Sequence, residues 1–241
     1  MRVSRVHTPC ALNEGMQLVL DDDTAHYLSK VLRLRPQDRV SLFNALDGEF
    51  EGVIQQVGKR SVTVQLEDQV PCLANPTLAI HLGLGLSRGE RMDYAIQKAT
   101  EAGVSSITPL MTERCEVRLN EERKESRVTH WEKVAISACE QGGRTQIPLI
   151  HSPQILSDWL ALPRPGRAFV LDFSGQSGLP REKAPEAVTF FIGPEGGLST
   201  DEVKAAMAAG FECLRLGPRV LRTETAPVVA IALAQQLWGD Y

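Results

Sequence analysis

Two stretches near the end of the chain contain residue types that bind and activate small molecules. The first, FFIGPEGGLSTDEV (190–203), places three glycines, a proline and Glu195 directly after an apolar run. The second, LRLGPRVLRTETAPVV (214–229), brings Arg219, Arg222 and Glu224 together in front of an apolar segment. Glycine lets a ligand approach the backbone closely, while arginine and carboxylate groups stabilise charge and move protons. The two stretches therefore predict two loops of one binding site.

The elements around the first stretch follow from its capping signal. Ser199 and Glu202 form the capping-box pattern S-x-x-E, so a helix is expected to begin there and to end at Gly210. The glycine-rich segment is then a loop at the carboxyl end of a strand, where open α/β sheets bind ligands. No Lys-Ser or Lys-Thr pair follows the glycines, so the segment is not the phosphate loop of nucleoside triphosphatases.

The second stretch also predicts a loop between a strand and a helix. Gly217 and Pro218 interrupt the chain after an apolar run, and Thr223 and Thr225 follow among the charged residues. Pro227 fits the first turn of the following helix, which is apolar almost all round. That helix should be buried, either in the core or against a second subunit.

The segment from residue 77 onward alternates strand and helix patterns, which is typical of an α/β fold. We expect a mostly parallel sheet with helices on both faces. The expected strands are 77–85, 106–110, 168–173, 188–193 and 212–217, and the expected helices are 91–103, 128–141, 200–210 and 226–238.

Residues 1–72 instead predict a small β-rich domain. Apolar and polar residues alternate in the expected strands 40–43, 50–57 and 61–66. A helix over 24–34 precedes them behind the capping sequence DDDT, so we expect a short β-barrel with one helix. The segment 70–76 is interpreted as a linker.

A second glycine pattern, Gly83, Gly85 and Gly89, offers a competing interpretation. It resembles a dinucleotide-binding fingerprint and would make the protein a nicotinamide-dependent oxidoreductase. However, the spacing is one residue too long, and Gly83 and Gly85 lie inside the apolar run. Glycines of a crowded parallel strand explain the pattern better.

Composition narrows the class of protein. The 241 residues are 43% hydrophobic and 23% charged with a net charge of -4, as in an ordinary globular protein. The five cysteines form no C-x-x-C pair, so neither zinc nor disulfides are expected and a reducing cytoplasm is favoured. The start of the chain lacks the apolar core of a secretory signal, and no apolar stretch is long enough to span a membrane.

Four motifs carry a resemblance to a known family. IGPEGGLSTDEV (192–203), LRLGPRVLRTETAPVVAIAL (214–233), RMDYAIQKATEAGVSSITPL (91–110) and ACEQGGR (138–144) closely resemble the RsmE-type ribosomal RNA methyltransferases of the SPOUT class. The resemblance implies an α/β domain over 73–241 with a C-terminal trefoil knot. It also implies a PUA-like RNA-binding domain over 1–72.

The same resemblance implies an activity and a cofactor site. Such enzymes transfer a methyl group from S-adenosylmethionine to N3 of a uridine in 16S rRNA of the small subunit. Carried over to this chain, the residues implied to bind the cofactor are Gly193, Pro194, Glu195, Gly196, Leu216, Gly217, Leu221, Arg222 and Thr223.

Three residues are candidates for the chemistry. Arg222 is the first candidate for stabilising negative charge on the uracil, and Arg144 is the second. Glu224 could accept the N3 proton, although an acid at this place also suits the start of the last helix. The five histidines have no partners at catalytic spacing, so a histidine base is not expected.

Partners follow from the basic residues of the first domain and from the resemblance. The residues hypothesised to contact RNA phosphates are Arg2, Arg5, Lys30, Arg33, Arg35 and Arg39. The resemblance and the apolar last helix predict a homodimer. The alternative function is a non-catalytic RNA-binding factor of ribosome assembly that keeps the same fold.

Overall fold

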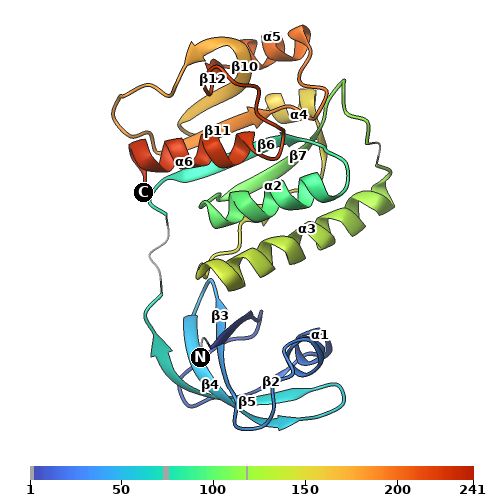
Figure 1. Cartoon of the computed structure of the whole chain (residues 1–241), viewed down its shortest axis with the longest axis vertical. Helices are drawn as coiled ribbons and strands as arrows, with labels where there is room; N and C mark the ends of the chain where they lie inside the picture. The colour runs from blue at the N-terminus through green and yellow to red at the C-terminus, as the bar shows by residue number, and fades with distance from the viewer. Residues whose placement is uncertain (1–2, 73–75, 118) are drawn as a thin grey trace. The chain divides into compact units, whose positions relative to one another are not determined.

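The computed structural model describes residues 3–72, 76–117 and 119–241 (Figure 1). The chain divides into two compact units, Met1–Asn75 with Cys139–Ile147, and Pro76–Ala138 with Pro148–Tyr241. The expected division at residues 72 and 73 did not anticipate that Cys139–Ile147 groups with the first unit. Residues 73–75 of the expected linker lie outside the described residues.

The first unit contains a five-stranded sheet and a short helical segment. In the order β1-β3-β4-β5-β2, β1 and β3 run parallel and the other neighbours run antiparallel. One face buries an apolar cluster that includes Leu42, Ile54 and Val64. Its elements are β1 (Ser4–His7), β2 (Gln17–Leu20), α1 (Asp22–His26), a π-helical turn (Tyr27–Val31), β3 (Arg39–Asn44), β4 (Gly48–Val57) and β5 (Val62–Val70).

The sequence predicted the three long strands of this sheet but missed β1 and β2. Each of the missed strands has only four residues, too few for alternation to stand out. The helix expected over 24–34 begins and ends earlier than predicted, because α1 starts at Asp22 and the π-helical turn ends at Val31. Asp21 caps it by accepting a hydrogen bond from the Thr24 N–H at 2.8 Å, and the helical path ends before Arg33, whose φ is +55°.

The second unit is built on a seven-stranded sheet in which every neighbouring pair is parallel. This confirms the predicted α/β fold with a parallel sheet. The order is β12-β10-β11-β6-β7-β8, and β9 also pairs with β7. Its elements are β6 (Ala79–Gly85), α2 (Glu90–Glu101), β7 (Ser106–Met111), β8 (Leu149–Ile150), β9 (Gln154–Ile155), α4 (Leu156–Leu160), β10 (Arg167–Ser177), β11 (Ala187–Ile192), α5 (Thr200–Ala208), β12 (Glu212–Arg215) and α6 (Ala226–Trp238), with most of α3 (Glu121–Gly142).

Helices cover both faces of this sheet, as two adjacent residues of β11 show. Phe191 packs with Trp159 of α4 and with Phe211, which follows α5. Phe190 points to the other face and stacks on Phe169, which in turn stacks on Trp238 of α6. Successive side chains of a strand alternate between faces, so β11, whose residues are all buried, is covered from both sides. Figure 1 shows α2 and α6 adjacent in this unit.

The glycines of β6 have a packing explanation. A side chain at Gly83 would meet the Trp159 ring at 2.4 Å, and one at Gly85 would meet the Pro194 backbone nitrogen at 2.4 Å. These glycines belong to a crowded strand, as predicted, and Gly85 lets the 193–197 loop lie directly against β6.

The sequence placed one helix late and missed three short elements. The helix α3 begins at Glu121, seven residues before the expected start at Val128. The first seven residues, EERKESR, are polar throughout, so no apolar period marks them. The strands β8 and β9 and the helix α4 have two, two and five residues, below the length at which periodicity is readable.

Candidate functional site

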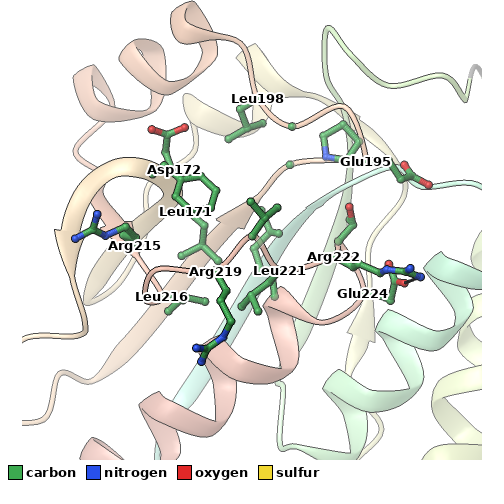
Figure 2. A pocket seen from close by; sticks show the side chains of 18 of the residues that line it. Leu171, Asp172, Glu195, Leu198, Arg215, Leu216, Arg219, Leu221, Arg222 and Glu224 are labelled. Carbon is green, nitrogen blue, oxygen red and sulfur yellow. Dashed lines mark ion pairs between the residues drawn. The ribbon is translucent and has the colours of Figure 1, made fainter.

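A cavity of about 560 Å³ opens in the second unit at the carboxyl ends of β10, β11 and β12 (Figure 2). Most of its wall comes from residues 171–173 of β10, the glycine-rich loop after β11, and the chain from Leu214 to Ala226, and Arg91 of α2 also lines it. Both loops that the sequence singled out therefore line one cavity. The volume lies within the range of small-molecule sites.

The capping box predicted after the glycine-rich loop is present. The Ser199 hydroxyl accepts a hydrogen bond from the Glu202 N–H, while the Glu202 carboxylate accepts one from the Ser199 N–H at 2.8 Å. Glu202 also accepts from the Glu113 N–H at 2.7 Å, which ties the loop after β7 to the start of α5. The loop thus enters α5 with its direction fixed.

Contacts within the protein also require the glycines of this loop. A side chain at Gly193 would press on Leu198 at 2.9 Å, and one at Gly196 would press on Arg114 at 2.9 Å. Gly197 has a φ of +69°, which only glycine adopts without strain. These contacts fix the path of the loop, and Gly193 and Gly197 also line the cavity.

Glu195 fastens the loop to the start of α2. Its Oε1 accepts from the Arg88 N–H at 3.1 Å and from the Arg91 guanidinium at 3.0 Å. Burial acts to raise the pKa of Glu195, but hydrogen bonds from its own N–H, from Arg88 and from Arg91 outweigh burial, so the pKa is lowered. The carboxylate stays charged and positions the loop.

The second loop carries a loosely paired arginine and carboxylate. Arg222 is 83% exposed and its guanidinium lies 4.0 Å from the carboxylate of Glu224, which is 16% exposed. Thr225 is the N-cap residue of α6 but its side chain makes no capping hydrogen bond. Glu224 directly precedes the N-cap, so it is not itself the cap residue but still lies at the start of α6, where an acid is favourable.

The structure brings most of the sequence-predicted cofactor residues to the cavity. Gly193, Pro194 and Glu195 line one side, and Leu216, Gly217, Leu221, Arg222 and Thr223 line the other. Gly196 does not line the cavity, because its Cα faces Arg114, whose guanidinium donates to the Gly196 carbonyl.

The candidate catalytic residues are divided between the two units. Arg222 and Glu224 both line the cavity. Arg144 belongs to the first unit, where its backbone carbonyl accepts a hydrogen bond from Arg5 at 3.3 Å. It is not one of the residues that line the cavity.

Several lining residues were not anticipated from the sequence. Leu171, Asp172 and Phe173 end the regular part of β10, and Arg91 and Arg215 also reach the cavity. Leu171, Asp172 and Phe173 lie outside the quoted motifs, whereas Arg91 and Arg215 lie inside two of them but were not singled out. The position of 171–173 could have indicated the first three. Ligands in open α/β sheets bind beyond the carboxyl ends of strands, and these residues end the expected strand 168–173.

The predicted RNA-binding arginines have different surroundings. The prediction that Arg5 contacts RNA phosphates must be corrected, because its side chain is only 11% exposed. Its guanidinium donates to Glu49 and to the carbonyls of Cys139, Glu140 and Arg144. Arg39 is exposed but pairs with Glu51 and Glu67 at 2.6 and 2.7 Å. Lys30, Arg33 and Arg35 are exposed, and Arg2 lies outside the described residues.

The described part of the chain offers neither a cluster of metal ligands nor a membrane-spanning helix. Within residues 3–72, 76–117 and 119–241, no group of three or more histidine, cysteine, aspartate or glutamate side chains could hold a metal ion. Among the helices of these same ranges, none combines the length and the apolar character needed to cross a bilayer.

His81, which was expected in a strand, lies in β6 and shares a 2.8 Å hydrogen bond with Ser106.

A parallel sheet with helices on both faces and a cavity at its strand ends defines an α/β ligand-binding protein. The family model described as the RNA methyltransferase domain matches residues 74–235, and the one described as the RNA methyltransferase PUA domain matches residues 20–67. The chain therefore belongs to the RNA methyltransferase family that these models describe.

Individual relatives match the chain over nearly its whole length. A protein of Buchnera aphidicola subsp. Schizaphis graminum named ribosomal RNA small subunit methyltransferase E is 34% identical over 243 residues, covering 99% of this chain and 98% of the relative. A Bacillus subtilis protein with the same name is 24% identical over 231 residues, covering 92% of this chain and 90% of that relative.

Solved structures agree in fold. A Legionella pneumophila protein described as a methyltransferase in complex with the cofactor SAM has a TM-score of 0.95 at 35% identity, with both chains covered completely. The ribosomal RNA small subunit methyltransferase E of Neisseria gonorrhoeae, bound to S-adenosyl methionine, has a TM-score of 0.90 at 33% identity, again over 100% of both chains.

Proposed function

We propose that this protein binds S-adenosylmethionine in the cavity and methylates N3 of one uridine in the 16S rRNA of the small ribosomal subunit. The observation that carries the proposal is the cavity itself. Two neighbouring loops at strand ends, both with motifs of the family, line it together. The full-length relatives named as small-subunit rRNA methyltransferases support the reaction class.

The lining residues suit this cofactor chemically. Leu171, Leu216 and Leu221 supply apolar walls against which an adenine ring can pack. The backbone groups of Gly193, Gly197 and Gly217, the last with a φ of +103°, stand at the cavity without side chains that would shield them. When bound, the cofactor supplies a methyl group on a positively charged sulfur.

The residues of this chain would then act on the uracil. Uridine N3 loses a proton as it gains the methyl group, and negative charge develops on the neighbouring carbonyl oxygens. Arg222 is exposed enough to reach a bound base and would stabilise that charge. Glu224, on the same loop, would accept the proton. Arg144 remains a second candidate for stabilising the charge.

The proposal extends to the organisation of the protein. The 73–241 segment would form the methyltransferase domain, with a C-terminal trefoil knot around the cofactor site. The 1–72 segment would hold the RNA through phosphate contacts of Lys30, Arg33 and Arg35. The protein would act as a cytoplasmic homodimer, with the apolar α6 contributing to the subunit interface.

The deciding experiment uses methyl-labelled S-adenosylmethionine and small ribosomal subunits that lack base methylation. After incubation with the protein, the RNA is digested and the labelled nucleoside is identified by mass spectrometry. Labelled 3-methyluridine at a single position is the expected result. Cofactor and subunit binding without label would favour the non-catalytic assembly factor, and label on another nucleoside would overturn the assignment of uridine N3.

A further inference from the structure

The strand β10 contains an irregularity beside the cavity. Leu171 pairs with Leu214 of β12, and Gln176 pairs with Leu214 again, so the residues between them leave the ladder. Gly175 permits this path, because a side chain there would lie 2.5 Å from the Cys213 carbonyl carbon and from the Leu214 nitrogen. Irregularities of this kind turn side chains toward functional sites.

The first residue of the irregular segment is Asp172, which lines the cavity. Its Oδ1 accepts hydrogen bonds from the Ser174 N–H at 2.9 Å and from the Ser174 hydroxyl at 2.5 Å. These contacts fix the carboxylate but leave its negative charge without a compensating cation among the described residues. The two other carboxylates of the cavity differ, because Glu195 pairs with Arg91 and Glu224 lies near Arg222.

A basic side chain with an open donor lies on the neighbouring strand. Arg215 follows Leu214 on β12 and also lines the cavity. Its Nε is buried and has no hydrogen-bond acceptor in the part of the chain that the structure describes. A buried donor without an acceptor is costly, so a bound acceptor would stabilise this arrangement.

Asp172 and Arg215 thus bring opposite charges to one cavity from adjacent strands without forming an ion pair with each other in the described structure. Figure 2 shows both residues on one side of the cavity, with Glu195, Arg222 and Glu224 on the other side. The two sides are therefore available for different parts of the reaction.

We propose that Asp172 and Arg215 form a subsite for the zwitterionic amino-acid end of S-adenosylmethionine. Asp172 accepts hydrogen bonds from the α-ammonium group, and Arg215 donates hydrogen bonds to the α-carboxylate. Charge-assisted bonds of this kind are the strong ones, and a zwitterion needs one partner of each sign. The inference rests on the proposed function, and it assigns the opposite side, with Arg222 and Glu224, to the RNA base.

The test compares three ligands by isothermal titration calorimetry on the full chain. S-adenosylmethionine and S-adenosylhomocysteine both carry the amino-acid end, whereas 5′-methylthioadenosine lacks it. The variants are Asp172→Asn, which keeps the oxygen that Ser174 contacts, and Arg215→Gln. We expect each variant to weaken the first two ligands by about five- to tenfold and to leave 5′-methylthioadenosine unchanged.

Matched controls change the same charges outside the cavity. Asp201→Asn removes a carboxylate that is 91% exposed at the start of α5, and Arg181→Gln removes an exposed arginine. Both controls should bind all three ligands like the parent protein. Retained binding of 5′-methylthioadenosine also reports that the pocket of each test variant is folded.

Three results would overturn the subsite. If both variants bind S-adenosylmethionine with unchanged affinity, the subsite is wrong while the proposed function stands. Equal loss of all three ligands would show a general effect on the pocket. Loss of S-adenosylmethionine alone from Asp172→Asn would place this carboxylate against the charged sulfur instead. If the parent protein binds none of the ligands, the proposed function itself fails.

Discussion

Each unit of this protein contains an arginine–glutamate pair, and the two pairs are built in opposite ways. In the first unit, Arg5 and Glu49 are each 11% exposed and their charged atoms lie 2.8 Å apart. In the second unit, the corresponding atoms of Arg222 and Glu224 lie 4.0 Å apart and the arginine is 83% exposed. The same two residue types thus serve stability in one place and are left available in the other.

The difference comes from what surrounds each arginine. Arg5 donates to the carbonyls of Cys139 and Glu140 in the last turn of α3, and the Cys139 carbonyl also accepts from the Gly143 N–H at 3.1 Å. It also lies over the Phe43 ring, with 4.3 Å between the guanidinium carbon and the ring centroid. Arg222 has no comparable set of acceptors in the described structure. An arginine is available for a ligand only when the fold has not already used its donors.

The largest expected effect comes from breaking the buried pair. Replacing Arg5 by methionine leaves the Glu49 charge buried, so the free energy of unfolding should fall by about 3 kcal/mol or more. Urea unfolding followed by circular dichroism measures this. The control Arg39→Met removes an arginine that is 48% exposed, and it should cost less than about 1 kcal/mol. Equal effects of the two changes would contradict the contrast between buried and exposed pairs.

The exposed pair should respond in activity and not in stability. Replacing Arg222 by alanine should lower the rate of methyl transfer at saturating cofactor by roughly 100-fold, because a donor to developing charge is lost. The free energy of unfolding should change by less than about 0.5 kcal/mol. Arg222→Lys keeps the charge and should recover part of the rate. A rate like that of the parent protein would remove Arg222 from the proposed chemistry.

A smaller effect is expected from the exposed arginines of the first unit. The double variant Arg33→Ala/Arg35→Ala should weaken binding to small-subunit rRNA about tenfold and lower the salt slope by roughly 1 for each lost phosphate contact. Filter binding at several salt concentrations measures both quantities. Arg39→Ala is the matched control, and its effect should be smaller because Glu51 and Glu67 already hold that guanidinium.

The smallest effect concerns two carboxylates with opposite pKa shifts. Burial raises the pKa of Glu140 in the first unit, against the opposing effects of the His7 N–H and Arg5, whereas hydrogen bonds lower the pKa of Glu195 in the second. A lowered pKa contributes stability above the unfolded value of about 4.3, and that stability is lost as the pH falls through the folded pKa. A raised pKa changes the stability in the opposite direction. The contribution of Glu140 is favourable at low pH and is lost as the pH rises through its folded pKa, because the buried carboxylate must then be charged.

These signs predict diverging pH profiles for two amide variants. Glu195→Gln should be less stable than the parent protein at pH 7, by less than about 1 kcal/mol, and should match it near pH 3. Glu140→Gln should match the parent at low pH and become relatively more stable as the pH rises toward 7. Thermal melts between pH 3 and 7 measure both differences. Profiles of the same sign for both variants would refute the opposite shifts.

Much of the fold was readable from the sequence where local signals are strong. The helix α6 spans the predicted residues Ala226–Trp238, and the Ser199–Glu202 capping box fixed the start of α5. Gly210 was a readable signal for the end of α5, since glycine is common just after a helix. In the structure Gly210 has a φ of +90°, and its N–H donates to the Met207 carbonyl at 3.0 Å. The polar start of α3 and the two-residue strands gave no such signal.

The candidate site was readable only in part. The two glycine-proline loops are marked by their composition, and both line the cavity. Asp172 was missed because its neighbours in the sequence give no signal, and Arg215 was not singled out from the other arginines of the second stretch. The two residues come to one cavity through the pairing of Leu171 with Leu214, which are 43 positions apart (214 − 171).

The alternation of strands and helices and the two loops could be predicted from local sequence, because capping, turn formation and hydrophobic periodicity act over a few neighbouring residues. Which charges are already neutralised depends instead on contacts between distant parts of the chain. Arg5 and Arg222 look equally available in the sequence, yet Arg5 is enclosed by Glu49 and the end of α3. Burial and pairing depend on residues brought together from distant parts of the chain, and these set the free energy of each charge.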